Sequence, residues 1–176
     1  MLKRITISLF VLVLIILSFS CDDKGISPLP KVDEVSGFEG TVYFLSPWPD
    51  SIRRTYLVVF KNPLLQPSDF VVFNLKYLSR EIPFGTRVFK FSSLDSALIP
   101  VSPGPFEPGE YHYVAVAHQT TEELSLARKD WFVSGVYYVN NDTTKPGILK
   151  IEENRMTRNV DIRVDFRKLP AQPPGG

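Results

Sequence analysis

Short apolar runs separated by turn residues repeat along most of the chain. The runs are rich in Val, Ile, Phe and Tyr, which favour strands, and the residues between them include Pro, Gly, Asn and Asp, which favour turns. Runs of this length and spacing are typical of a β-sandwich or barrel. The pattern predicts strands at residues 37–45, 55–61, 69–78, 87–92, 109–119, 131–140, 147–152 and 159–167.

The last of these runs, residues 159–167, has the clearest alternation. Its apolar members are Val160, Ile162, Val164 and Phe166, and its charged members are Asp161, Arg163, Asp165 and Arg167. Because successive side chains of a strand point to opposite faces, we expect the apolar set to face the core and the charged set to face water.

Only one segment predicts a helix. Thr120 and Glu123 have the spacing of a capping box, and the apolar residues that follow extend the expected helix to residue 129. The final segment, residues 169–176, is rich in Pro and Gly, so we expect a disordered tail there.

The first 20 residues have a different pattern from the rest. Lys3 and Arg4 precede an uninterrupted apolar run at residues 9–17, which is typical of a secretory signal peptide. A generous count of the apolar segment, residues 5–19, is shorter than the roughly 20 residues that a helix needs to cross a bilayer. The pattern therefore predicts a removable signal peptide at residues 1–20.

Cys21 is the only cysteine of the chain and directly follows this segment. The run Leu-Ser-Phe-Ser-Cys at residues 17–21 resembles a bacterial lipobox, although Ser18 stands where that family usually has Leu. The resemblance implies that Cys21 carries a diacylglyceryl thioether and usually an acylated amine, which together anchor the protein in membrane lipid. It also implies the bacterial cell envelope, either periplasmic or surface-exposed. An ordinary secreted protein and an uncleaved anchor are the alternatives.

Residues 21–35 combine Pro and charge without periodicity, and they predict a lipidated tether. Fully stretched, such a segment reaches at most about 50 Å. The acidic pair Asp22 and Asp23 resembles lipoprotein sorting signals, which direct retention in some bacteria and surface export in others. The leaflet is left open.

Composition supports one folded domain, which we place at residues 36–168. The 176 residues contain 20 Lys and Arg against 19 Asp and Glu, so a nucleic-acid partner is not expected. Hydrophobic residues at 44% exclude a disordered protein, and 15 Pro with 10 Gly favour turns over long helices. With Cys21 lipidated, no disulfide, thiol nucleophile or thiolate metal ligand remains.

The segment Phe-Glu-Pro-Gly-Glu-Tyr-His-Tyr-Val-Ala-Val at residues 106–116 resembles a pattern of carboxypeptidase-regulatory-like and transthyretin-like modules. In this pattern Gly109 supplies a turn, and Tyr111 can place its ring inward as a tyrosine corner. The resemblance covers residues 36–167 and implies a single Greek-key, Ig-like β-sandwich of seven or eight strands. The Asp-Gly turn usual in that family is missing. Such modules are mostly noncatalytic binding or spacer units.

A search for chemistry predicts no catalytic residue, metal or cofactor. His112 and His118 lie about 20 Å apart on one predicted strand, too far to share a metal ion. Asp161 and Asp165 are about 13 Å apart, beyond a glycosidase pair. The chain has no Gly-x-Ser-x-Gly elbow, phosphate-binding glycine loop or His-Glu-x-x-His motif.

Two tryptophans are candidates for recognition. Trp48 lies in a Pro-rich turn, where an exposed indole could contact a sugar or a protein, or could instead fold back as a lid on the sandwich end. Trp131 begins an apolar strand and is expected in the core.

These observations predict a lipid-anchored, noncatalytic envelope or surface module with a structural or protein-interaction role. The alternatives are a carbohydrate or peptide receptor that uses Trp48 or an open edge strand, and an envelope hydrolase with a site assembled only by the fold. The expected partners are membrane lipid through Cys21 and an envelope protein or glycan. The oligomeric state is left open.

Overall fold

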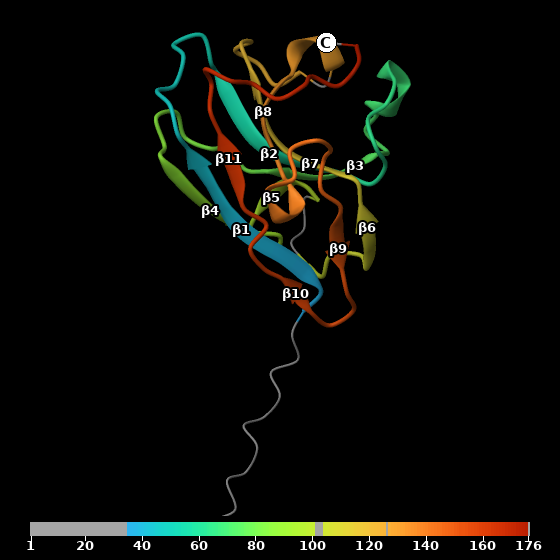
Figure 1. The fold of residues 1–176 in the computed structure, drawn as a ribbon. Coiled ribbons are helices and arrows are strands. Elements are labelled where there is room, and N and C mark those ends of the chain that lie inside the picture. Colours follow the sequence, from blue (N-terminus) through green and yellow to red (C-terminus); the bar gives the residue numbers. More distant parts are fainter. Residues whose placement is uncertain (1–34, 101–103, 126, 176) are drawn as a thin grey trace, which may run out of the picture. The chain divides into compact units, whose positions relative to one another are not determined.

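Two β-sheets packed face to face form most of the structure, so the predicted all-β sandwich is confirmed (Figure 1). The computed structural model describes residues 35–100, 104–125 and 127–175. The predicted signal peptide, Cys21 and nearly all of the tether therefore lie outside the described residues.

The first sheet is organised around β1 (Gly37–Phe44). β4 (Val88–Ser92) pairs antiparallel with β1, while β10 (Met156–Thr157) and β11 (Ile162–Val164) pair parallel with it. Between β10 and β11 the backbone of Val160 comes so close to Gly40 that a Cβ there would collide with the Val160 carbonyl. The strand that forms here, β11, is shorter than the predicted 159–167, and Asn159 before it has a positive φ of 61°, which an extended strand does not allow.

The second sheet has five antiparallel strands in the order β5-β3-β2-β7-β8. These strands are β5 (Ala97–Ile99), β3 (Leu75–Ser79), β2 (Arg54–Phe60), β7 (Tyr113–Gln119) and β8 (Phe132–Val136). The sequence pattern did not predict β5 or β10. Both are very short, so neither has room for a recognisable alternation.

The predicted strand at 109–119 is interrupted at His112. β6 (Gly109–Tyr111) pairs with β9 (Leu149–Ile151), and β7 begins after the interruption in the five-stranded sheet. The backbone N–H of His112 donates to the carbonyl of Lys61 at 3.3 Å. The chain thus passes from a two-stranded sheet into the larger one at this residue.

Two further predictions are corrected in the loops. The segment before β3 forms the 3-10 turn η1 (Pro67–Asp69), because the Asp69 carboxylate accepts the backbone N–H groups of Leu65 and Gln66 at 2.8 and 3.0 Å. The predicted helix at 120–129 is wrong: among its described residues only the turn η2 (Arg128–Asp130) is helical. The side chain of Gln119 instead closes a loop by donating to the carbonyl of Ser125 at 2.8 Å.

The space between the two large sheets holds the inner cluster, which both sheets and the β6-β9 pair build. The predicted alternation of residues 159–167 is confirmed, since Val160, Ile162 and Val164 are fully buried and Phe166 is half-buried against them. The inner cluster comprises Phe38, Val42, Phe44, Leu57, Val59, Tyr77, Ile82, Phe91, Phe106, Tyr111, Val114, Val116, Leu149, Ile151, Val160, Ile162 and Val164.

Tyr111 makes the predicted tyrosine-corner contact. Its ring is buried in the inner cluster, and its hydroxyl donates to the carbonyl of Glu107 at 2.7 Å. Burial, with a smaller contribution from the charge of Glu107, raises the pKa of Tyr111 to about 12.

A second apolar cluster, the outer cluster, covers the other face of the five-stranded sheet. It makes β2 and β7 buried on both faces, and it includes Trp131, which is 4% exposed as expected for a core residue. The outer cluster comprises Tyr56, Val58, Phe60, Leu64, Leu75, Leu78, Tyr113, Ala115, Ala117, Trp131, Val133 and Val136.

The C-terminal segment is held on the sandwich rather than frayed as predicted. The backbone N–H of Val133 donates to Gln172 Oε1 at 2.8 Å, and Gln172 Nε2 donates back to the Val133 carbonyl at 2.9 Å. Arg128 also donates to the carbonyl of Pro173 at 2.5 Å. In Figure 1 this red segment runs past the end of β8.

Candidate functional site

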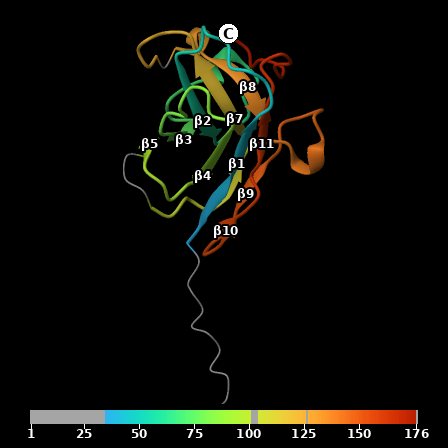
Figure 2. The same ribbon diagram turned by 90° about the vertical axis from the view of Figure 1, so that its left-hand side faces the viewer.

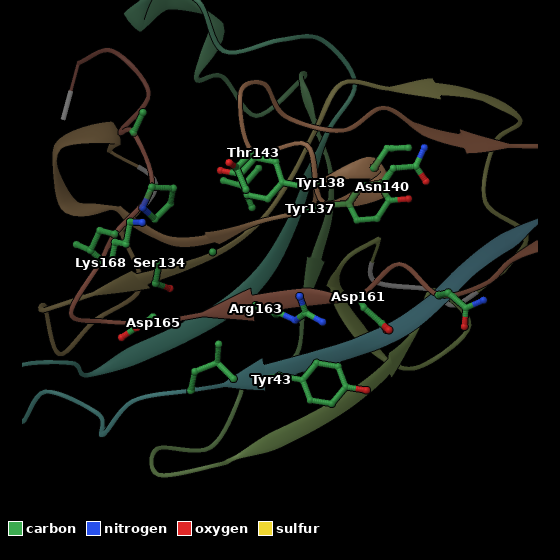
Figure 3. Close-up of a pocket in the computed structure, with 18 residues that line it drawn as sticks. Tyr43, Ser134, Tyr137, Tyr138, Asn140, Thr143, Asp161, Arg163, Asp165 and Lys168 are labelled. Atoms are coloured by element: carbon green, nitrogen blue, oxygen red, sulfur yellow. The ribbon is translucent and has the colours of Figure 1, made fainter.

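A groove of about 870 Å³ lies along the side of the sandwich, where an edge strand of each sheet meets the other (Figure 3). Residues of β1 and β11 form one wall, and the end of β8 with the loop after it forms the opposite wall. In Figure 2 this loop, drawn in orange and carrying the 3-10 turn η3 (Val139–Asn141), projects from the side of the sandwich.

Gly135 allows the two walls to meet at the base of the groove. A Cβ at this position would lie 2.8 Å from Val164 Cγ2 and 2.9 Å from the Arg163 carbonyl oxygen. A larger residue would therefore push β8 away from β11. Beyond it, Tyr137 donates its backbone N–H to the Val114 carbonyl at 2.9 Å and accepts that of Gly147 at 2.8 Å, which fixes both ends of the projecting loop.

The β11 wall presents the charged residues that the sequence assigned to a solvated face. The backbone N–H of Thr41 donates to Asp161 Oδ1 at 2.9 Å, which orients that carboxylate. Arg167 donates to both oxygens of Asp165 at 2.9 and 3.0 Å, and this bidentate contact lowers the pKa of Asp165 to about 2. Arg163, on β11, lies between the two carboxylates, which flank the strand at its two ends (Figure 3). The solvated face is thus one wall of the groove.

Tyrosines stand on both walls. Tyr43, on β1, is 37% exposed, and Tyr137 is half-buried on the opposite side (Figure 3). Burial raises the pKa of Tyr137, and the negative charge of Asp161 raises it further.

Sequence reasoning missed Tyr43 and Tyr137 as site residues. Tyr43 did carry a signal, because it follows the core residue Val42 in an alternating strand and so places a large aromatic ring on the outward face. Tyr137 carried none, since its position depends on how the chain leaves β8.

The hydroxyl of Ser134 is the only serine group at the groove among the described residues, and it is already engaged. It is buried and donates to the carbonyl of Val116 at 3.1 Å. No histidine lines the groove, and the described residues contain no cluster of three or more metal-ligating side chains. The groove offers aromatic faces and hydrogen-bonding groups, which suit noncovalent binding.

Trp48 lies outside the groove, as a lid on one end of the sandwich. Its indole N–H donates to the carbonyl of Thr86 at 2.9 Å. Its ring packs against Phe44 at 4.5 Å, Phe166 at 5.3 Å and Phe84 at 5.4 Å between ring centroids. This is the folded-back alternative, and a ligand contact by Trp48 stays a prediction.

The two histidines occupy different environments. His112 is half-buried at the interruption between β6 and β7. His118 is buried near the end of β7, where it is only 8% exposed. Its ring stacks on Phe132 at 5.7 Å and meets the edge of Phe166 at 5.9 Å. Burial lowers the pKa of His118 to about 4, which keeps the ring neutral at pH 7.

A smaller, apolar cavity of about 340 Å³ opens beside the outer cluster. The loop before β3 forms one side of it, and Phe73 on that loop is 89% exposed. Unlike the groove, it offers almost no hydrogen-bonding side chain. The cavity is lined by Val58, Phe60, Phe70, Val71, Val72, Phe73, Leu75 and Trp131.

No protein-family model, curated protein or solved structure matches the chain. Within the part of the chain that the structure describes, no helix is long and apolar enough to cross a membrane.

Proposed function

We propose that this protein is a lipid-anchored, noncatalytic binding module of the bacterial cell envelope. Cys21 carries the lipid, residues 22–35 form the tether, and the transthyretin-like sandwich holds an envelope partner in its side groove. The lipobox-like sequence at residues 17–21 supports the anchor.

The groove is the observation that carries the binding role. Its volume of about 870 Å³ falls within the range of ligand sites, which is roughly 300–1,000 Å³. Most of one wall belongs to paired strands, so Tyr43 and Arg163 are held by sheet hydrogen bonds before a ligand arrives. A site built in this way binds without a large ordering cost.

The anchor is tested by mass spectrometry of protein extracted from membranes of the producing bacterium. Residues 1–20 should be absent and Cys21 should be acylated. An unmodified Cys21 in the mature chain would contradict the anchor.

The binding role is tested by retention on envelope fragments. Full-length protein in detergent micelles is mixed with washed envelope fragments, and the sedimenting fraction is measured. Tyr43→Ala should reduce retention at least about fivefold, because it removes an exposed ring of the groove. Phe73→Ala removes a more exposed ring elsewhere and should retain wild-type binding. Equal retention of all three proteins, or loss only with Phe73→Ala, would overturn the assignment to the groove.

A further inference from the structure

The geometry of the groove points to a neutral oligosaccharide as its ligand, an inference that rests on the proposed binding function. Three observations lead to it: the tyrosines of the two walls, the balance of charge between them, and the closed edge of β8.

The tyrosines provide the apolar part of such a site. A sugar ring has one face of C–H groups and a rim of hydroxyls, so it packs on an aromatic face while its rim stays available for hydrogen bonds. Tyr43 on one wall and Tyr137 on the other lie on opposite sides of the space a chain of sugar rings would occupy (Figure 3).

Polar side chains suited to hydroxyl groups stand next to these rings. The backbone N–H of Thr41 donates to Asp161 Oδ1, and a carboxylate can accept several hydrogen bonds at once. Asn140, held at a positive φ of 55° in η3, and Asn159 add amide groups that can both donate and accept. Paired donors and acceptors of this kind match neighbouring sugar hydroxyls.

The charges that line the groove cancel. The lining contains Asp161 and Asp165 on the negative side and Arg163 and Lys168 on the positive side. The bidentate contact from Arg167 further compensates Asp165. A ligand with a large net charge would meet no matching field here, so a phosphorylated or polyuronic ligand is not favoured.

The closed edge of β8 argues against an extended peptide. A peptide that adds as a strand needs unpaired backbone N–H and C=O groups. At Val133 both groups already bond to the Gln172 side chain, so an added strand has no free backbone partner at that residue. Recognition by the side chains of the groove is therefore favoured over strand addition.

The test is binding of full-length protein in detergent micelles to an array of immobilised oligosaccharides. The array carries neutral chains of glucose, galactose and N-acetylglucosamine, with uronic-acid chains and neutral decapeptides as comparisons. We expect saturable binding to at least one neutral chain. Tyr43→Ala and Tyr137→Ala should each weaken it about tenfold or more, whereas Tyr137→Phe, which keeps the ring, should stay within about threefold.

Phe73→Ala is the matched control, and it should bind like the wild type. Thermal unfolding shows whether each variant is folded. If a tyrosine variant is not, Asp161→Asn tests the same groove through its hydrogen bonds and should weaken binding about fivefold or more.

Binding only to uronic-acid chains or only to peptides would overturn the carbohydrate inference. So would absence of array binding while retention on envelope fragments still depends on Tyr43, a result that would leave the proposed binding function standing. Absence of any dependence on groove residues in both assays would overturn both.

Discussion

The inner and outer clusters lie on opposite faces of the same five-stranded sheet but are covered by different kinds of structure. Apart from Ile82, Phe106 and Val160, the inner cluster is built from strand residues of both large sheets and the small one. On its outer side, the sheet is covered by the loop before β3, by Trp131 and by the C-terminal segment. One face is thus closed by regular pairing, and the other by segments without regular structure.

From this difference we expect substitutions in the inner cluster to lower the free energy of unfolding more than changes in the segments that cover the outer cluster. Packing between two sheets fixes each inner residue from several sides, so its loss leaves a cavity that cannot collapse. Loops and a terminal segment can shift, so the segments that cover the outer cluster should open locally at a lower free-energy cost.

The largest expected effect is at the centre of the inner cluster. Ile162 is fully buried, and Ile162→Ala should lower the free energy of unfolding by about 2–5 kcal/mol. The neighbouring exposed Arg163→Ala should change it by no more than about 0.5 kcal/mol. Chemical denaturation measures both, and equal effects would contradict the burial of Ile162 and the exposure of Arg163.

The next effect concerns His118, which continues the inward-facing positions of β7. Its pKa lies near 4 in the folded state and about 6.5 when unfolded, so below pH 6.5 the unfolded state binds more protons. Stability should be full above pH 6.5 and decrease by about 2–3 kcal/mol as the pH falls towards 4.

Denaturation at several pH values, compared with His118→Leu, isolates this contribution. The variant should lose most of the decrease between pH 6.5 and 4. Asp165 adds to the loss only below its ordinary pKa of 3.8, because its lowered pKa stabilises the fold above that value. An unchanged pH profile in His118→Leu would contradict burial of a neutral ring.

A smaller effect on the free energy of unfolding is expected where the C-terminal segment contacts β8. Gln172→Ala removes both hydrogen bonds to Val133 but leaves that backbone accessible to water, so the cost should be about 1 kcal/mol. Hydrogen exchange should show faster exchange at the Val133 amide, while amides of β2 stay protected. A loss as large as that of Ile162→Ala would remove the distinction between the clusters.

The inner cluster could be predicted from the sequence, because the burial of its strand residues follows from the alternation of apolar and polar positions. Residues 159–167 and Tyr111 show this, since their burial follows from a period of two and from the Pro-Gly turn. The loop that covers the outer cluster could not be predicted in this way. Phe70 to Phe73 has the composition of a strand, yet the Asn74 side chain donates to the Asp69 carbonyl at 2.9 Å and holds the segment as a turn.

The groove could be predicted only in part from the sequence, for a related reason. The sequence placed Asp161 and Arg163 on one outward face, which is correct. It could not place Tyr137 opposite them, because that depends on the close approach of β8 to β11 at Gly135 and on the path of the following loop. Such an arrangement is set by tertiary packing between distant segments.

The Gln172 side chain bears on how the protein behaves at high concentration. An exposed strand edge presents unpaired backbone groups with which a neighbouring molecule can pair. At Val133 one side-chain amide imitates the backbone of an added strand and satisfies that position of the edge within the same chain. The segment around Gln172 thereby blocks pairing with another molecule at this position of β8.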